Sequence, residues 1–201
     1  MSPRPHVIKL GGSLLELPDL LPRLELVLAE VPRPVLLVGG GRAADAVRDL
    51  DRQLGLGEEA AHWLAIRALA LNARALAAVL GDAELVETPA DCRAAWRRER
   101  TAVVEPDAWL RDEDARGVRT PHVWDFTSDS IAAHLARQLG GARLTLLKSA
   151  LPAQPGSGAA ALASAGFVDR CFPAVSAGLG AVEVINLRDP RRPRCSIRSG
   201  A

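Results

Sequence analysis

The sequence predicts an α/β protein in which a mostly parallel central sheet is covered by helices. The main observation is that the order strand, glycine turn, helix occurs twice within the first third of the chain. The chain has 201 residues, 48% of them hydrophobic, and this length is enough to bury about 70% of the unfolded surface. It shows no internal repeat and no clear boundary, so we expect a single domain over residues 1–201.

The first unit starts with a short apolar strand over residues 6–10. A glycine-containing turn at residues 11–13 interrupts it. Leucine and valine then recur over residues 17–28 with the spacing of an amphipathic helix, and prolines follow. This unit therefore has the order expected of a parallel sheet with a covering helix.

The second unit repeats the same order. An apolar strand over residues 35–38 leads into a triple-glycine turn at residues 39–41 and a helix over residues 42–54. The next segment, residues 58–80, lacks Gly and Pro and is apolar almost all round, so it predicts the longest helix. Such a helix is either buried or part of a subunit interface, and we expect a homo-oligomer, a dimer or larger.

The rest of the chain carries shorter or weaker patterns. They predict a strand near 85–86, a helix near 91–98, a strand over 101–104, mostly loop over 105–121, a helix over 128–139, a strand over 143–148, a connection over 152–158 and a last strand over 182–187. The helix over 128–139 is well defined because Thr127 and Ser128 are suited to cap it and Asp129 suits its first turn.

Charge and cysteine usage exclude several classes of protein. The net charge is +1, and a nucleic-acid binder usually concentrates excess positive charge, so no nucleic-acid partner is expected. The apolar run at the start of the chain is too short for a signal peptide or a membrane span, so no membrane partner is expected either. Three unevenly spaced cysteines fit a reducing compartment. We therefore expect a soluble cytoplasmic protein.

The lysines are more informative than the total charge. Of 25 basic residues only two are Lys, at Lys9 and Lys148, and each lies at or near the carboxyl end of a predicted strand. Ligands of open α/β sheets bind at that edge. A lysine ammonium approaches a phosphoryl oxygen as a compact point charge, which the planar arginine fork does not reproduce. The two lysines are therefore candidates for a functional site.

The two glycine turns are candidates for phosphate binding because backbone N–H groups stabilise anionic oxygens. Neither turn follows the P-loop pattern, and no dinucleotide-binding G-x-G-x-x-G occurs. The alternative is that these glycines only permit tight turns. Two such turns in consecutive units, one of them preceded by Lys9, favour the functional interpretation.

A third motif runs from Trp124 into the helix over 128–139. Asp129 in its first turn could orient one or both lysines or help to hold Mg²⁺, while Thr127 and Ser128 offer hydroxyl groups to a phosphate. Alternatively, Asp129 only caps the helix. The four histidines have no metal-ligand spacing, so no residue is assigned as a direct metal ligand.

The order of these motifs resembles the amino acid kinase superfamily. The resemblance rests on Lys-Leu-Gly-Gly-Ser at 9–13, Gly-Gly-Gly at 39–41, Ser-Asp-Ser-Ile-Ala-Ala at 128–133 and the apolar strand that follows. It covers roughly residues 7–148, with a weaker tail to 187. It implies a three-layer αβα sandwich and transfer of the γ-phosphoryl group of Mg-ATP to a carboxylate, carbamate or phosphate oxygen.

The resemblance also implies roles for single residues on the ATP side. Lys9 would hold the transferring phosphoryl group and neutralise its charge in the transition state. Gly11 and Gly12 would donate N–H groups to ATP phosphates, with Ser13 beside them. Asp129 matches the acid that positions the catalytic lysines. These roles agree with the physics of phosphoryl transfer, in which placement and charge neutralisation do most of the work.

The C-terminal part departs from the larger members of the superfamily. After their corresponding strand, many relatives carry an aspartate-centred turn and, later, another catalytic lysine. Here Lys148 ends the strand and the remaining 53 residues contain no lysine, so the nucleotide-binding portion, about 125–201, is shortened. Lys148 then either takes over the role of the missing cation or is an ordinary charged end of a strand.

On the acceptor side, the sequence is similar to a short subgroup of phosphate kinases in methanofuran biosynthesis. The shared motifs are Trp-Asp-x-Thr-Ser-Asp-Ser from 124, Leu-Leu-Lys-Ser from 146 and Val-Asp-x-x-Phe-Pro from 168. The implied reaction, part of one-carbon metabolism, converts (5-(aminomethyl)furan-3-yl)methyl phosphate to its diphosphate with ATP and Mg²⁺.

By this resemblance Gly39, Gly40 and Gly41 would face the acceptor, and Trp124 could cover its flat ring. Arg42 is a candidate for contact with the phosphate of the substrate.

Arg48 is a second candidate for this phosphate contact, with solvated helix surface as the alternative.

Two other functions stay open. The same fold could phosphorylate a carboxylate or another phosphate monoester, as acetylglutamate, uridylate or isopentenyl phosphate kinases do. The chain could also be a nucleotide-binding regulatory protein without turnover, which the missing aspartate and lysine would favour. Release of ADP over a panel of small-molecule acceptors separates these alternatives.

Overall fold

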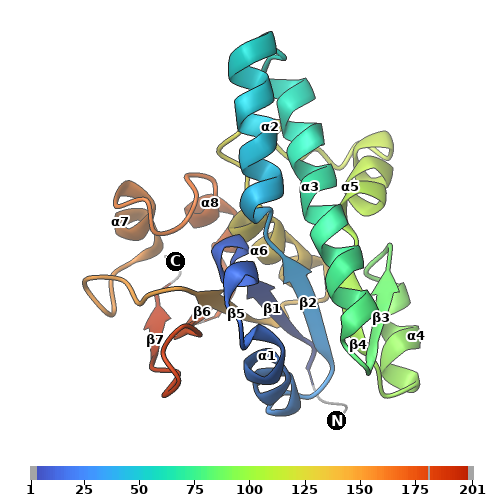
Figure 1. Ribbon diagram of the computed structural model, residues 1–201, viewed down its shortest axis with the longest axis vertical. Coiled ribbons are helices and arrows are strands. Elements are labelled where there is room, and N and C mark those ends of the chain that lie inside the picture. The colour runs from blue at the N-terminus through green and yellow to red at the C-terminus, as the bar shows by residue number, and fades with distance from the viewer. Residues whose placement is uncertain (1–3, 181, 199–201) are drawn as a thin grey trace.

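In residues 4–180 and 182–198, which the computed structural model describes, the strands form one seven-stranded sheet (Figure 1). They lie in the order β3, β4, β2, β1, β5, β6, β7, and all neighbouring pairs are parallel except β6 and β7. The strands are β1 (His6–Leu10), β2 (Pro34–Val38), β3 (Ala83–Val86), β4 (Thr101–Val104), β5 (Arg143–Lys148), β6 (Val182–Asn186) and β7 (Arg194–Ile197). The predicted α/β class with a mostly parallel sheet is confirmed.

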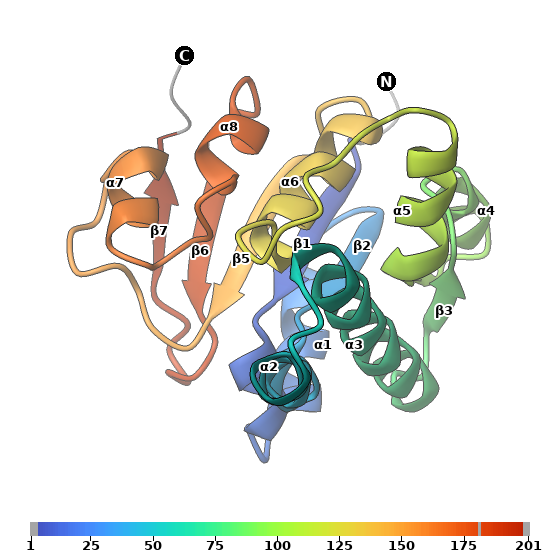
Figure 2. The ribbon, with the colours of Figure 1, turned by 90° about the horizontal axis from the view of Figure 1, so that it is seen from above.

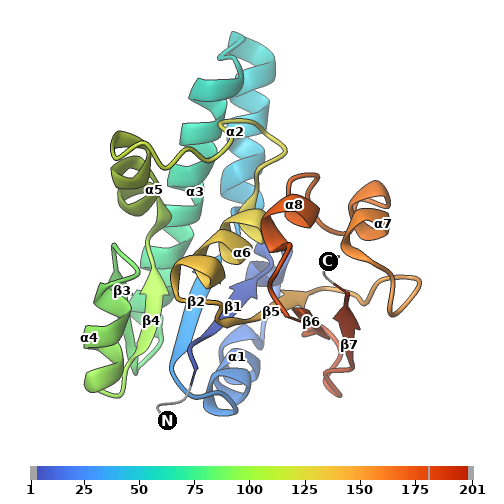
Figure 3. The ribbon, with the colours of Figure 1, turned by 180° about the vertical axis from the view of Figure 1, so that it is seen from behind.

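Helices cover both faces of this sheet, which gives the expected three layers (Figures 2 and 3). The first face carries α4 (Asp91–Arg97), α5 (Pro106–Ala115), α6 (Ser128–Gln138), α7 (Ala159–Ser164) and α8 (Phe172–Ser176), and the second carries the short 3₁₀ helix η1 (Gly12–Glu16) and α1 (Leu20–Ala29). The long helices α2 (Gly41–Leu54) and α3 (Glu58–Val79) pack on each other, and α2 and the start of α3 project beyond the sheet (Figure 1). The C-terminal half of α3 packs on the second face of the sheet.

The central strand β1 is buried on both faces, as expected for a parallel sheet between two helical layers. Side chains alternate along a strand, so Val7 packs into the core beneath α6, while Ile8 and Leu10 pack into the core beneath α1. Lys9 shares the face of Val7. This alternation turns the charged side chain of Lys9 toward α6 near the carboxyl end of an apolar strand.

The prediction that residues 105–121 are mostly loop is wrong, because α5 occupies much of this segment. Pro106 is the first helical residue, and the Glu105 carboxylate accepts a hydrogen bond from the N–H of Ala108 at 3.2 Å. Trp109 and Leu110 are each 1% exposed. Two large apolar side chains buried against the core stabilise a helix whose many charged residues suggest a loop.

Other differences concern element ends and the C-terminal part. The predicted helix over 17–28 begins later, as α1 at Leu20, because the backbone of Leu17 is extended; the residues just before Leu17 form the short helix η1, which overlaps the predicted glycine turn. Helices α7 and α8 are too short to give a recognisable periodicity, and β7 lies in the basic tail, where pairing with β6 creates it. None of the helices described is long and apolar enough to cross a membrane.

Candidate active site

Parallel pairing of β1 with β5 brings the two lysines of the chain to one edge of the sheet. Lys9 lies opposite Leu146 in the register, and Lys148 ends the neighbouring strand. Both ammonium groups reach Asp129 in the first turn of α6: Lys9 Nζ lies 2.9 Å from Oδ1 and Lys148 Nζ lies 2.6 Å from Oδ2. The structure thus joins three residues that are far apart in the sequence, and Asp129 orients both lysines.

This cluster of Lys9, Lys148 and Asp129 is largely buried, and burial strengthens the attraction between its charged groups. Lys9 is 5% exposed and Asp129 is 4% exposed. Burial alone would raise the pKa of Asp129, but the charges of Lys9 and Lys148 outweigh it and hold this pKa below its usual value. For Lys148, burial and the nearby charge of Lys9 lower the pKa despite the opposing effect of Asp129. Two cations facing one anion leave a net positive charge that can attract phosphate.

A second carboxylate, Asp169, holds the start of α6 in place. It accepts hydrogen bonds from the N–H and hydroxyl of Thr127 at 3.3 and 2.7 Å, from the N–H and hydroxyl of Ser130, and from the N–H of Phe172. The Thr127 hydroxyl donates its proton to Asp169 in this structure, so its contact with a phosphate stays a prediction. Asp169 ties the start of α6 to α8.

The two glycine turns touch each other directly. A Cβ atom on Gly12 would lie 2.1 Å from the nitrogen of Gly41, and one on Gly39 would lie 2.7 Å from the nitrogen of Gly12. Only glycine permits this approach of two backbones, and Gly41 also has a φ of +49°. The contact makes one continuous surface from turns that are distant in the sequence.

Two of the predicted site glycines use their N–H groups inside the fold, so their contacts with ligands stay predictions. The N–H of Gly11 donates to the carbonyl of Leu147 at 2.9 Å. The N–H of Gly39 donates to the carbonyl of Leu10 at 2.8 Å, and Gly39 is not among the residues that line the neighbouring pocket. Both glycines serve the internal geometry of the turns.

A pocket of about 330 Å³ lies beside the glycine turns, between α2, α3 and the start of α6. The predicted site residues that line it are Gly12, Ser13, Gly40, Gly41, Arg42, Arg48, Trp124, Thr127 and Ser128. Helices η1, α2 and α6 all begin here, and the first N–H groups of a helix lack intrahelical partners. The pocket therefore offers backbone donors to an anion at one end and apolar walls at the other.

The candidate substrate residues at the rim are already engaged with protein groups. Arg42 Nε lies 2.6 Å from Glu16 Oε1, and its side chain is 83% exposed. The indole N–H of Trp124 donates to Asp51 at 2.9 Å, and the guanidinium of Arg48 lies 5.3 Å from the centre of the Trp124 ring. Trp124 thus joins the loop before α6 to the projecting helix α2.

Asn72 is a site residue that nothing in the sequence pattern singles out. Its side-chain amide donates to the carbonyls of Gly39 and Gly40, at 2.8 Å each, and so holds the triple-glycine turn. Asp169 could have been found, since it lies in the motif from residue 168 that resembles the short kinase subgroup. Asn72 could not, because it lies within a long helix, in no motif, far along the chain from the glycines that it contacts.

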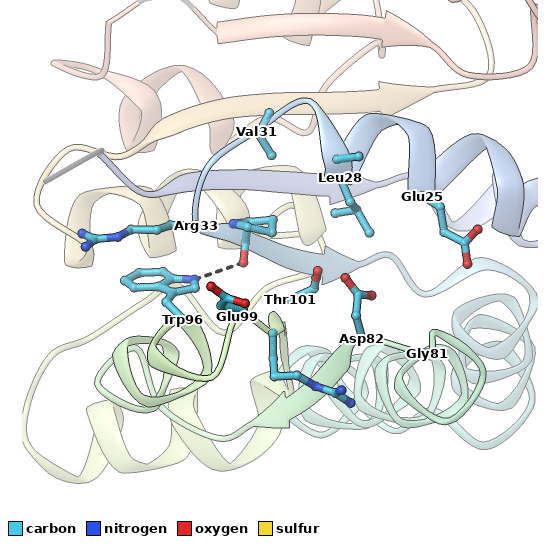
Figure 4. A pocket seen from close by; sticks show the side chains of 12 residues that line it. Glu25, Leu28, Val31, Arg33, Gly81, Asp82, Trp96, Glu99 and Thr101 are labelled. Atoms are coloured by element: carbon cyan, nitrogen blue, oxygen red, sulfur yellow. Dashed lines mark hydrogen bonds between the residues drawn. The ribbon is translucent and has the colours of Figure 1, made fainter.

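A larger cavity of about 610 Å³ lies at the opposite edge of the sheet, near the amino ends of β2 and β4 (Figure 4). Here the indole of Trp96 donates to the carbonyl of Pro34 at 3.2 Å. The lysines and the glycine turns lie at the carboxyl ends of the strands, so this cavity is remote from them. Size alone does not identify the active site.

Fold and site together define an α/β protein that presents cations and helix starts to anions at the carboxyl edge of its sheet. The sequence pattern of the amino acid kinase family matches residues 5–150, and the protein belongs to this family.

A curated relative is the (5-(aminomethyl)furan-3-yl)methyl phosphate kinase of Methanocaldococcus jannaschii, which is 29% identical over 136 residues. The match covers 67% of this chain and 61% of that relative. The chain therefore matches less than two thirds of the length of that kinase.

Solved structures of three kinases share the fold. UMP kinase from Bacillus anthracis has a TM-score of 0.67 at 11% identity, covering 94% of this chain and 90% of that one. Uridylate kinase from Archaeoglobus fulgidus has a TM-score of 0.52 at 21% identity, covering 76% and 64%. Aspartate kinase from Synechocystis has a TM-score of 0.58 at 14% identity, covering 97% and 40%. These similarities establish the three-layer fold.

Proposed function

We propose that the protein is an ATP-dependent kinase that transfers a phosphoryl group to a small phosphate monoester. The observation that carries this proposal is the convergence of Lys9 and Lys148 on Asp129, next to a pocket at which helices begin. Transfer between two phosphates concentrates negative charge at the reacting centre. Buried, preorganised cations stabilise such charge without rearrangement of solvent.

Each part of the site has a defined task in this proposal. Lys9 contacts the transferring phosphoryl group, Lys148 contacts the phosphates of ATP, and Asp129 keeps both ammonium groups in place. Gly12, Ser13 and Ser128 line the pocket, and in this proposal they lie between the nucleotide and the acceptor. We propose that the nucleotide binds along the C-terminal portion, about 125–201, where β5 ends beside α7 and α8.

The residues present also fit a magnesium ion that arrives with the nucleotide. Among the described residues no group of three or more His, Cys, Asp or Glu side chains could hold a metal ion. Both oxygens of Asp129 face lysines. Mg²⁺ commonly takes its ligands from substrate phosphates and water with one or two carboxylates, so a protein cage is not required. When bound, the ion would neutralise phosphate charge.

We propose (5-(aminomethyl)furan-3-yl)methyl phosphate as the acceptor and its diphosphate as the product. The named activity of the relative that is 29% identical supports this choice. The pocket supports it as well, because about 330 Å³ suits a small monocyclic molecule. Its walls include Trp124 and Phe126, whose rings can pack against a flat furan.

The test is ADP release with a panel of acceptors at fixed ATP and Mg²⁺. We expect turnover with the furan phosphate and much less with acetylglutamate, UMP or isopentenyl phosphate. Turnover only with acetylglutamate would overturn the phosphate-monoester proposal. Tight ATP binding with no acceptor-stimulated ADP release would favour the regulatory alternative instead.

Lys148→Ala is expected to raise the KM for ATP by about tenfold or more, because one charge-assisted contact with a phosphate is lost. The contact between Lys148 Nζ and the carbonyl of Phe167, 2.9 Å long, shows that the side chain is already oriented without nucleotide. Initial rates at varied ATP check this. A KM for ATP equal to that of the wild type would mean that Lys148 does not contact ATP and is only the charged end of a strand.

We further propose that the kinase works in the cytoplasm, where ATP is available, as a homo-oligomer. Two large apolar side chains, Leu50 and Leu54, are exposed one turn apart on the projecting helix α2. Neighbouring exposed apolar side chains are suited to contact with a second copy. Sedimentation velocity reports the oligomeric state directly, and a monomer at all concentrations would contradict this part of the proposal.

A further inference from the structure

Helix α6 is not capped by the side chain of its own N-cap residue. That residue is Thr127, and its hydroxyl makes no hydrogen bond to the first turn of the helix. An N-cap hydroxyl normally accepts the N–H of the second or third helical residue. Here the Asp169 carboxylate accepts the N–H of the third residue, Ser130, at 3.0 Å. Asp169 lies 39 residues after Ser130, so a distant segment supplies the cap of the helix that carries Asp129.

The Asp169 carboxylate is fully occupied by protein donors. The N–H and hydroxyl groups of Thr127 and of Ser130 donate to it, and so does the N–H of Phe172 at the start of α8, which lies beside α6 (Figure 3). A carboxylate offers about four lone pairs to donors. The five donors here leave none for a ligand or a metal ion. Asp169 therefore can act on the reaction only through the groups that it holds.

The group that it holds most directly is Asp129. This residue lies between Thr127 and Ser130 in the first turn of α6, and both of these neighbours are bound to the Asp169 carboxylate. The backbone that carries Asp129 is thus fixed on each side. Because the two oxygens of Asp129 contact the two lysine ammonium groups, a displacement of this turn would move the anion relative to both cations at once.

The segment that carries Asp169 also contacts Lys148 directly. The carbonyl oxygen of Phe167 accepts a hydrogen bond from Lys148 Nζ at 2.9 Å, and this nitrogen lies 5.2 Å from the centre of the Phe167 ring. Burial lowers the pKa of Lys148, and the negative charge of Asp169 acts against this lowering. Residues 167–169 therefore hold one lysine directly and the anion shared by both lysines indirectly.

We propose that Asp169 is a positioning residue for the phosphoryl transfer: it fixes the Asp129 carboxylate where both lysines meet it. The inference rests on the proposed function and adds to it a residue that touches neither substrate. A small misplacement of a reacting group lowers the rate of the chemical step by up to about a hundredfold, even when ligands still bind. Loss of Asp169 is therefore expected to lower kcat for ADP release by at least about tenfold, while the KM for the acceptor changes by less than about threefold.

The lysines give a direct readout of this arrangement, because Lys9 and Lys148 are the only two in the chain. In NMR spectra of protein that carries isotope-labelled lysine, each side-chain ammonium gives its own resonance, and Lys148→Ala assigns the pair. The test compares the wild type with Asp169→Ala in the absence of nucleotide and acceptor. We expect both resonances to shift and both ammonium groups to exchange hydrogens with water faster, since each loses part of its fixed contact with Asp129.

Asp125→Ala is the matched control. The Asp125 carboxylate lies 3.7 Å from the Arg170 guanidinium, so it also joins the loop before α6 to the segment that carries Asp169. However, these two side chains are 54% and 81% exposed, and an exposed ion pair of this kind adds little. The lysine resonances, kcat and KM of Asp125→Ala are expected to match those of the wild type. Shifts as large as those of Asp169→Ala would contradict a specific role for Asp169.

A second variant covers the case in which Asp169→Ala does not fold, which a thermal melt reveals. Asp169→Asn keeps the shape and one accepting oxygen, and it is expected to shift the same two resonances by a smaller amount. Unchanged lysine resonances in a folded variant overturn the positioning role. A rise in the acceptor KM as large as the fall in kcat overturns it as well, because it would indicate a general loosening of the pocket.

The outcomes also separate this inference from the proposed function. Shifted lysine resonances in Asp169→Ala together with a lower kcat support both. Shifted resonances in a protein whose wild type releases no ADP with any acceptor support the role of Asp169 in placing the lysines and overturn the kinase proposal. Release of ADP by the wild type, with lysine resonances or a kcat that Asp169→Ala leaves unchanged, supports the kinase proposal and overturns this inference.

Discussion

Lys9→Met is expected to lower kcat for ADP formation by about a hundredfold or more while the protein stays folded. The ammonium of Lys9 is buried and held 2.9 Å from Asp129, so it is positioned before the reaction begins. Such a cation stabilises charge that develops on the phosphoryl group in the transition state. Methionine replaces the side chain with a flexible apolar one, and Lys148 still neutralises Asp129.

Steady-state kinetics and a thermal melt of the same preparation check this prediction. Lys9→Arg serves as the matched variant, because it keeps the charge but replaces the compact ammonium with a planar fork in a space that is 5% exposed. We expect it to restore little of the activity. A kcat for Lys9→Met within twofold of the wild type would remove Lys9 from the mechanism.

Asp129→Asn is expected to lower the free energy of unfolding by about 3–5 kcal/mol, and with it to abolish turnover. Asparagine has nearly the same shape but no charge, so the two lysine ammonium groups would face each other in a buried site without an anion. Removing one partner of a buried ion pair is far more destabilising than breaking an exposed one. The structure makes this effect large because Asp129 neutralises both lysines at once.

Denaturant unfolding measures the difference, and Asp125→Asn is the matched control. Asp125 lies four residues earlier, and its side chain is 54% exposed, so its loss should change stability little. The contribution of Asp129 should also depend on pH. Because folding lowers its pKa, the stabilisation is complete above the usual aspartate range and disappears as the pH falls through the lowered value. Equal stability of the two variants at neutral pH would contradict the central role of this ion-pair cluster.

Much of the fold could be predicted because the signals are local. The strand over residues 6–10 has its predicted ends, and the helix over 58–80 is observed as Glu58–Val79. An apolar run bounded by glycine, or a long stretch free of Gly and Pro, needs no distant partner to be recognised. The family resemblance, also carried by short motifs, is confirmed by the match over residues 5–150.

Elements that depend on distant contacts could not be predicted in this way. Helix α5 is rich in charge and is stabilised by burial of Trp109 and Leu110 in the core. Strand β7 exists because Cys195 and its neighbours pair with β6. In both cases the stabilising contacts come from other parts of the chain. A short window of sequence therefore does not contain the interactions that stabilise the element, and it cannot predict it.

The features of the candidate site also divide into those with local sequence signals and those that depend on distant contacts. The sequence by itself determined that two lysines lie at or near the carboxyl ends of strands, that glycines follow two of the strands, and that an acid lies in the first turn of the helix over 128–139, since these are properties of neighbouring residues. Only the tertiary structure decided that both lysines meet on Asp129, that Gly11 and Gly39 use their N–H groups inside the fold, and that Asp169 and Asn72 hold the start of α6 and the triple-glycine turn. The physical reason is that a hydrogen bond or ion pair is defined by distance in space, and the register between β1 and β5 sets that distance across more than a hundred residues of chain.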